Sequence, residues 1–220
     1  VGDVMKLKDE NRIVVTEGLK KLANTKIQGL VSLMEKNTLD PEHISAYHVG
    51  FVLGPCLNAS GRLKTAQMAM ELLLAENKAQ ADELADELKA LNDERKDMTK
   101  DGTDAAIEQV ETELKDDKVL VVFLPDCHES LAGIVAGRIR EYYNKPVFVL
   151  TRAEGCAKGS GRSIEAYHMF HALVEVKDLL LKFGGHPMAA GFSLEEANIE
   201  EFRRRLNENA AKRLTEDDFI

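Results

Sequence analysis

The sequence has few cysteines and no long hydrophobic run, and each shortage argues against a class of protein. Cys56, Cys127 and Cys156 are far apart and show no Cys-x-x-Cys spacing, which argues against structural zinc and against a disulfide framework. A reducing, cytoplasmic environment is therefore expected. No apolar run approaches the roughly 20 residues that a membrane span requires, so a membrane protein is not expected either.

The sequence also lacks a targeting segment, an internal repeat and a low-complexity tract. Its first residues, VGDVMKLKDE, have the pattern of neither a signal peptide nor a transit peptide. They do not begin with methionine, so we expect a piece of a longer chain. The 220 residues suffice for one large or two small domains. With 44% hydrophobic and 30% charged residues, the composition is typical of a soluble globular protein.

Acidic charge is concentrated in one segment. The formal net charge of −9 argues against a nucleic-acid partner. However, residues 77–117 alone carry fourteen Asp and Glu against six Lys and Arg, a net of −8. Residues 118–194 carry nine basic and seven acidic side chains, a net of +2. The overall charge therefore does not exclude an anionic ligand in the second half of the chain.

The first half of the chain has the pattern of helices. Residues 11–75 indicate several short helices, interrupted within 50–66 by two glycines and a proline. Residues 77–114 have Leu and Met at helical spacing with charges between them, which indicates one long helix or two in line around Gly102.

The second half has the pattern of an α/β domain. KVLVVFL at 118–124 and KPVFVL at 145–150 indicate buried strands, and the helix between them completes a βαβ unit. CAKGSGRS indicates a third strand that runs into an exposed loop. The later elements are a helix at 165–181, a strand at 188–194 and a closing helix at 196–213. The fold class is therefore α/β, in three parts: helical 1–76, a long connecting helix 77–117 and an α/β domain 118–220.

The stretch KGSGRS has the composition of a phosphate-binding loop. Gly159 and Gly161 allow backbone N–H groups to converge on one point. Ser160 and Ser163 add hydroxyl donors, and Arg162 adds a planar guanidinium suited to phosphate oxygens. A plain β-turn with a surface arginine is the alternative.

A second glycine-rich stretch, GGHPMAAGFSL, begins at Gly184. Gly184 and Gly185 place His186 on backbone that can approach a ligand closely, where the imidazole donates to a phosphate or orients a metal-bound water. The alternative is that Gly184 caps a helix ending at Phe183 and that His186 is solvated.

Four further residues are candidates. His128 follows a strand and opens a helix, a place where ligands gather in open α/β sheets, although a surface histidine fits equally well. Asn58 and Arg62, in LNASGR, repeat the glycine–arginine theme or belong to a buried loop. Asp3 is a lone carboxylate, whereas a divalent metal needs several oxygen ligands. Because no Asp-x-Asp or Asp-His-His motif is present, the residues indicate phosphate binding without a complete catalytic centre.

The order of five segments is more specific than any one of them. GDVMKLKDENRIVVTEGLKKL, GFVLGPCLNASGRL, HESLAGIVAGRI, KGSGRS and KFGGHPMAAGFSL follow one another over nearly the whole chain. Together they resemble the C-terminal part of the core of the RecJ family, bacterial 5′→3′ exonucleases specific for single-stranded DNA within the DHH phosphoesterase superfamily. The last two segments resemble the signature of a DHHA1 domain, which implies an α/β fold with a central mixed sheet.

The resemblance implies a centre of two manganese or magnesium ions in a DHH domain, faced by a DHHA1 domain that grips the DNA. It implies that Asp3 is a metal ligand and catalytic residue, and that His186 acts near the scissile phosphate. Asn58 and Arg62 correspond to an element beside the cleft that contacts DNA. The other implied DNA contacts are His128, Gly159, Ser160, Gly161, Arg162, Ser163, Gly184 and Gly185.

The resemblance implies single-stranded DNA as a partner, with a single-strand-binding protein and a RecQ-type helicase as further partners. Two departures leave the role of His128 open: Cys127 replaces a usual aromatic residue, and Ser130-Leu131 replaces a common Gly-Val. Because most metal ligands would precede residue 1, this chain alone is expected to be nearly inactive. The alternatives are a phosphoesterase acting on oligoribonucleotides, cyclic dinucleotides or polyphosphate, and a non-catalytic DNA-binding relative.

Overall fold

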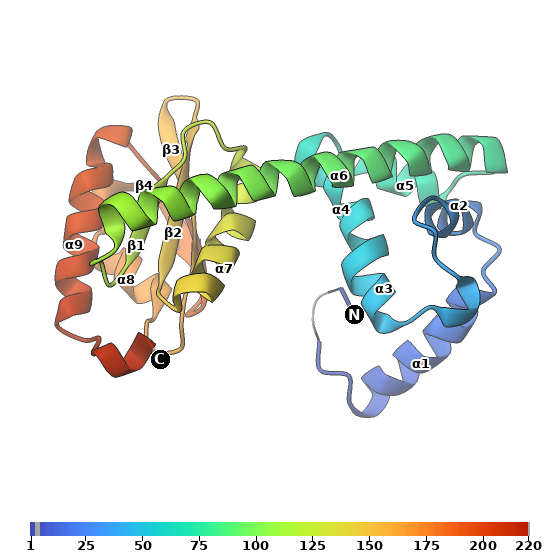
Figure 1. The fold of residues 1–220 in the computed structure, drawn as a ribbon, viewed down its shortest axis with the longest axis horizontal. Coiled ribbons are helices and arrows are strands. Elements are labelled where there is room, and N and C mark those ends of the chain that lie inside the picture. The colour runs from blue at the N-terminus through green and yellow to red at the C-terminus, as the bar shows by residue number, and fades with distance from the viewer. Residues whose placement is uncertain (3–4, 220) are drawn as a thin grey trace. The chain divides into compact units, whose positions relative to one another are not determined.

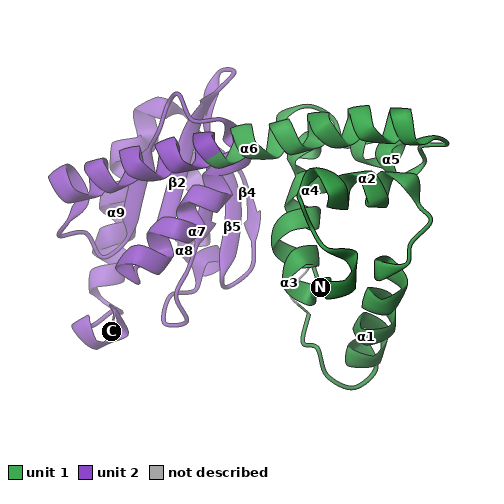
Figure 2. Ribbon diagram, turned by 45° about the vertical axis from the view of Figure 1, so that its right-hand side comes forward, with its two compact units in different colours: residues 1–96 green, residues 97–220 purple. Residues whose placement is uncertain are grey.

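The structure, a computed structural model, describes residues 1–2 and 5–219 (Figure 1). The chain divides into two compact units, Val1–Lys96 and Asp97–Ile220 (Figure 2). The boundary lies within α6 (Lys78–Gln109), the long helix that the periodicity predicts, and Gly102 does not interrupt this helix. In the described part of the chain, no helix is long and apolar enough to cross a membrane.

Unit 1 is helical, as the sequence predicts. Before α6 it contains α1 (Asp9–Ala23), α2 (Gln28–Lys36), α3 (Ala46–His48), α4 (Gly54–Leu63) and α5 (Gln67–Leu73). The predicted interruption within 50–66 is wrong. A π-helical turn, Val49–Leu53, joins α3 to α4, and Pro55 lies in the first turn of α4, directly after this turn. Gly61 lies inside α4, so the helix continues to the end of the LNASGR motif.

Unit 2 is an α/β domain with a five-stranded mixed sheet. Its strands are β1 (Leu120–Phe123), β2 (Val147–Ala153), β3 (Cys156–Arg162), β4 (Leu180–Gly185) and β5 (Ala189–Leu194). Its helices after α6 are α7 (Ala132–Tyr143), α8 (Met169–Glu175) and α9 (Ile199–Ala211). The spatial order is β1-β2-β3-β5-β4. The strands β1 and β2 are parallel and joined by α7, which confirms the predicted βαβ unit, and the other neighbours are antiparallel.

Two further predictions of secondary structure, both in unit 2, are wrong. KGSGRS is not a loop, because its first five residues belong to β3, inside the sheet between β2 and β5. The helix expected at 165–181 is the shorter α8, and the chain enters β4 at Leu180, so Gly184 caps no helix. Glycine-rich segments have low strand propensity of their own. Pairing with strands from elsewhere in the chain holds them extended.

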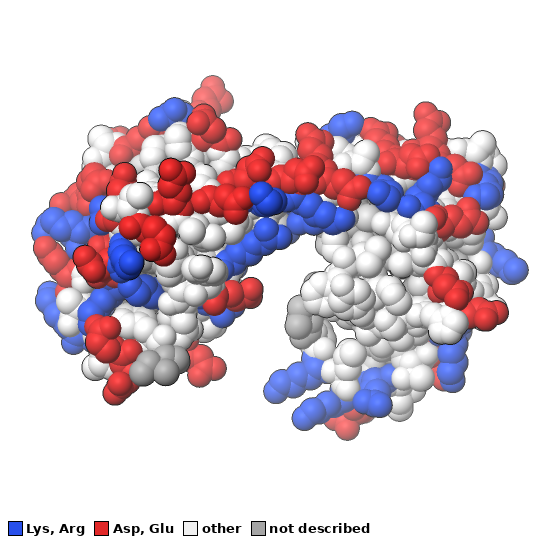
Figure 3. All heavy atoms as spheres, in the orientation of Figure 1, with Lys and Arg blue, Asp and Glu red and all other residues white. Residues whose placement is uncertain are grey.

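The sheet packs differently on its two faces. On the first, which we call the closed face, side chains of the strands pack against α8 and α9. Phe148, Phe192 and Phe202 form its centre, with ring centroids 5.0 to 5.5 Å apart. On the opposite face, Val147 and Val149 of β2 pack against α7 and the C-terminal part of α6. Acidic side chains gather along the upper edge of α6 (Figure 3).

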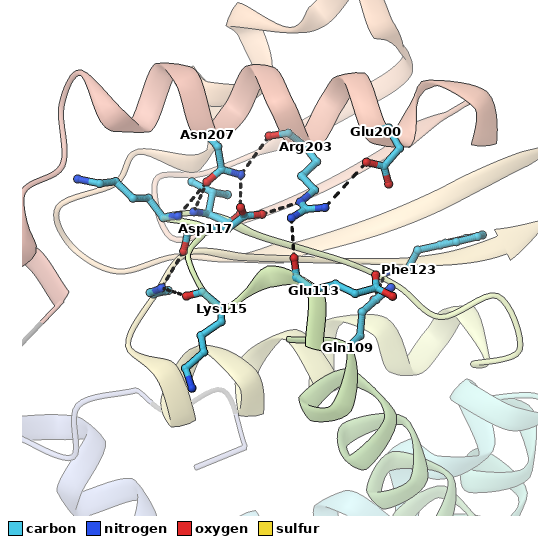
Figure 4. Close-up of polar contacts among 11 residues, drawn as sticks. Gln109, Glu113, Lys115, Asp117, Phe123, Glu200, Arg203 and Asn207 are labelled. Carbon is cyan, nitrogen blue, oxygen red and sulfur yellow. Dashed lines mark hydrogen bonds and ion pairs between the residues drawn. The ribbon is translucent and has the colours of Figure 1, made fainter. Parts of the chain in front are cut away.

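The outer edge of β1 is capped by side chains instead of another strand (Figure 4). Asn207 on α9 donates to the Val119 carbonyl (3.0 Å), and its Oδ1 accepts from the N–H groups of Lys118 (2.8 Å) and Val119 (3.0 Å). The Oε1 atom of Gln109 accepts from the Phe123 N–H (2.9 Å). These contacts satisfy polar groups of an edge strand and anchor α6 and α9 to it.

Candidate functional site

The two glycines of β3 face the aromatic core. A Cβ atom on Gly159 would lie 2.2 Å from the Phe192 ring, and one on Gly161 would lie 2.3 Å from Met169 Sδ. Real Cβ contacts do not come this close, so any larger residue would push these side chains out of place. Packing alone therefore accounts for both glycines.

Lys158, Ser160 and Arg162 lie on the opposite face of β3, because side chains alternate along a strand. Arg162 extends over the start of α7, so closely that a Cβ on Gly133 would lie 2.9 Å from Nη2. Its Nη1 donates to the Gly161 carbonyl at 2.8 Å. The guanidinium is therefore held between β3 and α7.

The segment that leads into α7 contributes polar side chains beside those of β3. The Nδ1 atom of His128 accepts from the Ser130 N–H (3.3 Å) and lies 2.8 Å from Ser130 Oγ. A neutral ring that accepts at Nδ1 carries its proton at Nε2. The Nζ atom of Lys158 lies 2.7 Å from Glu129 Oε2, and this hydrogen bond raises the pKa of Lys158. Glu129, Ser130, Lys158 and Ser160 border a pocket of about 250 Å³. His128 is not among the residues that line this pocket, but it directly precedes Glu129 in the sequence.

The second glycine-rich stretch lies beside the first. β5 pairs with β3, so that Ala189 is opposite Arg162 and Gly191 is opposite Ser160. His186 begins the turn between β4 and β5, and its N–H donates to the Ala189 carbonyl at 2.7 Å. Its side chain is exposed and has no hydrogen-bond or ion-pair partner among residues 1–2 and 5–219. Arg162 and His186 therefore lie at the same end of the sheet.

Three other predicted residues of unit 2 differ in their surroundings. Ser163 is buried, and its hydroxyl donates to the Tyr167 carbonyl at 2.5 Å, so this donor is used within the fold. Gly185 is close-packed, because a Cβ there would lie 2.5 Å from the Ala189 carbonyl oxygen. Gly184 is exposed, and a Cβ there would meet nothing within 4 Å.

The N-terminal candidates lie in unit 1 or outside the described residues. Asn58 and Arg62 are exposed on α4, four residues apart, so they occupy one helical face instead of a buried loop. Asp3 lies outside the described residues. Within residues 1–2 and 5–219, no three His, Cys, Asp or Glu side chains converge as a metal ion requires. The described residues therefore do not make a metal site by themselves.

Four residues of the site were missed from the sequence: Glu129, Ser130, Gly133 and Lys158. The sequence signal that identifies Lys158 is the alternation of side chains along a strand. If KGSGRS is assigned to a strand, every second residue from Lys158 faces the same side. Glu129, Ser130 and Gly133 carry no such signal, because only the packing of α7 on β3 brings them near.

Three comparisons with known proteins give concordant results. Residues 116–212 match the model of the DHHA1 domain. The chain is 41% identical to the single-stranded-DNA-specific exonuclease RecJ of Bacillus subtilis, over 100% of this chain and 28% of the relative. It is 39% identical to the Escherichia coli protein of the same name, over 94% of this chain and 38% of the relative.

A solved structure shows the same fold at the level of the whole chain. The crystal structure of RecJ from Thermus thermophilus in complex with Mg²⁺ is similar with a TM-score of 0.85 and 34% identity. The match covers 96% of this chain and 33% of the other. The chain therefore spans only about a third of the proteins that it matches.

Proposed function

Because the chain belongs to the RecJ family, with its DHHA1 domain at residues 116–212, we propose that it is part of an exonuclease that hydrolyses phosphodiester bonds of single-stranded DNA in the 5′→3′ direction. Unit 2 binds the sugar–phosphate backbone in this proposal. The relatives compared are named for single-stranded DNA. An enzyme for oligoribonucleotides, cyclic dinucleotides or polyphosphate, or a non-catalytic relative, is therefore not favoured.

One observation carries the proposal: β3 presents Ser160 and Arg162 on one face, opposite the start of α7. A guanidinium and a hydroxyl hydrogen-bond phosphate oxygens, and the cation makes these bonds charge-assisted. His128, the residue before Glu129, adds an Nε2–H donor in this proposal. His186, at the same end of the sheet, donates to the phosphate near the scissile bond. Gly159 and Gly161 contribute indirectly, because their size sets the path of β3.

The proposed reaction requires divalent metal, and the residues that the structure describes form no metal site by themselves. RecJ of Thermus thermophilus has been solved with Mg²⁺ and with Mn²⁺, and we propose the same ions for the whole enzyme. When bound, two such ions activate water and neutralise charge on the phosphate. Asp3 is the ligand proposed from this chain. The residues of unit 2 orient the strand and hold its phosphates.

Further parts of the proposal rest on the family resemblance. They are the division into 1–76, 77–117 and 118–220, DNA contacts by Asn58 and Arg62, and a cytoplasmic location. A single-strand-binding protein and a RecQ-type helicase are the proposed protein partners.

The binding role is tested with Arg162→Ala in this chain and a 3′-labelled single-stranded oligonucleotide. Hydrogen bonds to charged groups contribute about 1.5–3 kcal/mol, so we expect affinity to fall about tenfold or more. The slope of log affinity against log salt should also fall by about 0.7, the value for one phosphate contact on a single strand. Fluorescence anisotropy measures both.

Lys212→Ala is the matched control, because it removes one exposed cation after α9, away from β3. If Arg162→Ala binds DNA as Lys212→Ala does, Arg162 does not hold a phosphate.

The metal assignment is tested by incubating the chain with single-stranded DNA and Mn²⁺. Little or no degradation is expected, because the described residues make no metal site. Robust, metal-dependent degradation would show that the chain holds a complete catalytic centre.

A further inference from the structure

The face of the sheet that carries Arg162 stays open beyond β3. The residues on it, which we call the open face, are Lys158, Ser160, Arg162, Lys182, Gly184, Ala189, Gly191 and Ser193. All of them are exposed or half-buried, and none has a large apolar side chain. On the closed face the same strands carry Phe183, Phe192 and Leu194. The composition of the open face therefore favours contact with a polar ligand.

The strand register arranges the open face in rows. Directly paired residues share a face and lie about 5 Å apart, and successive rows lie about 7 Å apart. The first row is Lys158–Ser193–Lys182, and the next is Ser160–Gly191–Gly184. Arg162 follows beyond them on β3. Cations therefore stand on both sides of a row that contains only Ser and Gly.

Positive charge on the open face is not neutralised by its own strands. Arg162 and the two lysines of the first row share the face with no carboxylate of β3, β4 or β5. Lys158 is paired with Glu129, which lies just before α7. Lys182 is exposed and has no hydrogen-bond or ion-pair partner in the part of the chain that the structure describes. An anion can therefore bind Lys182 without displacing another group.

The two glycines of the open face are not explained by the fold. A Cβ on Gly184 would meet nothing within 4 Å, and one on Gly191 only the Gly159 carbonyl at 4.0 Å. Neither has a positive φ. Glycine weakens a strand, so its presence at two adjacent, unobstructed positions indicates close approach by a ligand.

The first row of the open face continues to a buried hydroxyl on β2. Thr151 of β2 is paired with Lys158 and so extends that row. It is fully buried, and its Oγ1 has no hydrogen-bond partner among the described residues. Such a group costs about 1–3 kcal/mol when it stays unsatisfied.

We propose that the open face binds a second phosphate of the DNA strand, adjacent to the one held by Ser160 and Arg162. Lys182 and Ser193 are its principal ligands, and Lys158 is shared between this phosphate and Glu129. Gly184 and Gly191 have no side chains, so the sugar–phosphate chain lies directly against the backbone of β5 and β4. This inference rests on the proposed function and gives the strand a direction across the sheet, from β3 towards β4.

The experiment compares Lys182→Ala, Gly191→Val and Lys212→Ala in the 220-residue chain, with a 3′-labelled oligothymidylate as the probe. Lys182→Ala should weaken binding about three- to tenfold and reduce the salt slope by about 0.7. Gly191→Val should weaken binding at least tenfold, because the valine side chain occupies the space where the sugar–phosphate chain would lie. Its free energy of unfolding in urea should stay the same or rise, since Val favours strands and its Cβ would meet only the Gly159 carbonyl oxygen, at 4.0 Å.

Two outcomes separate this inference from the proposed function. If Arg162→Ala weakens binding while Lys182→Ala and Gly191→Val behave like Lys212→Ala, the second phosphate site is wrong and the proposed function stands. If the wild-type chain fails to bind the oligonucleotide at about 50 mM salt, or if Arg162→Ala, Lys182→Ala and Gly191→Val all bind as the wild type does, both proposals are overturned. Weaker binding by Gly191→Val counts only if its unfolding midpoint is at least that of the wild type.

Discussion

The closed and open faces of the sheet consist of alternate residues of the same strands, yet their chemistry is opposite. On the closed face, the small residues Gly159 and Gly161 are required because Phe192, Phe148 and Met169 occupy the space above them. On the open face, the small residues Gly184 and Gly191 have empty space above them. Glycine is therefore present for two different reasons within one sheet. On the closed face the reason is internal packing, and on the open face, in our proposal, it is contact with a ligand.

The comparison also shows how a chain with a net charge of −9 can present a cationic surface. The carboxylates are concentrated on α6, where they face solvent (Figure 3). The strands of the open face contribute only Lys and Arg as charged residues. Phosphate recognition depends on the local field more than on net charge, because salt screens exposed charges beyond about 10 Å.

The largest expected effect on stability comes from substitution of a closed-face glycine. We expect Gly159→Val to lower the free energy of unfolding by roughly 3 kcal/mol or more. The reason is that Phe192 cannot move away, since it packs on Phe202 at 5.0 Å and on Phe148 at 5.4 Å. Urea unfolding followed by circular dichroism measures the change.

Gly191→Val is the control for this prediction, because it adds the same side chain to the opposite face. Equal losses of stability for the two variants would show that the faces are packed alike.

A high pH should lower the free energy of unfolding through Tyr167, which is buried in the core of the closed face. Burial raises the pKa of Tyr167 above its ordinary value of about 10. Above that pH the unfolded chain loses the phenol proton first, so the free energy of unfolding falls by up to about 1.4 kcal/mol per pH unit. Below it, this residue makes no pH-dependent contribution. Urea midpoints measured between about pH 9 and pH 11 test this.

Tyr167→Phe isolates the effect from other tyrosines. Its hydroxyl has no hydrogen-bond partner within the described residues, so its removal should cost little at neutral pH. The variant should lose less stability than the wild type on going to high pH. Identical pH profiles would mean that the phenol is ionised as easily in the folded protein.

The smallest expected effect is on the open face, from Glu129→Gln. The Lys158–Glu129 pair is about half exposed, with side-chain exposures of 52% and 48%, so its loss should change stability by less than about 1 kcal/mol. Lys158 is then available to a phosphate, and DNA affinity should rise about two- to fivefold. Anisotropy titrations measure the change, with Glu201→Gln on α9 as the control. An affinity gain no larger than that of Glu201→Gln would exclude competition between Glu129 and DNA.

Residue types in the sequence led to the candidate residues of the site, but they did not predict how these residues are arranged. Ser160, Arg162 and His186 became candidates because glycines, hydroxyls and cations in short stretches are typical of phosphate binding. The same glycines led to the wrong prediction of a loop, since glycine favours turns when only neighbours in sequence are considered. Ser163 has the right chemistry, yet its hydroxyl is used by Tyr167.

Sequence periodicity alone determined the elements whose stability is local. The helices α6 and α9 each bury a face that repeats at a fixed interval, and the strands of the βαβ unit contain continuous apolar runs. Both patterns are visible in a short window of sequence. The tertiary structure decided which glycine-rich segments became β3 and β4, which face Arg162 occupies and which residues Lys182 lies beside. These features depend on backbone pairing between segments far apart in the chain, and a register shift of one residue would exchange the two faces.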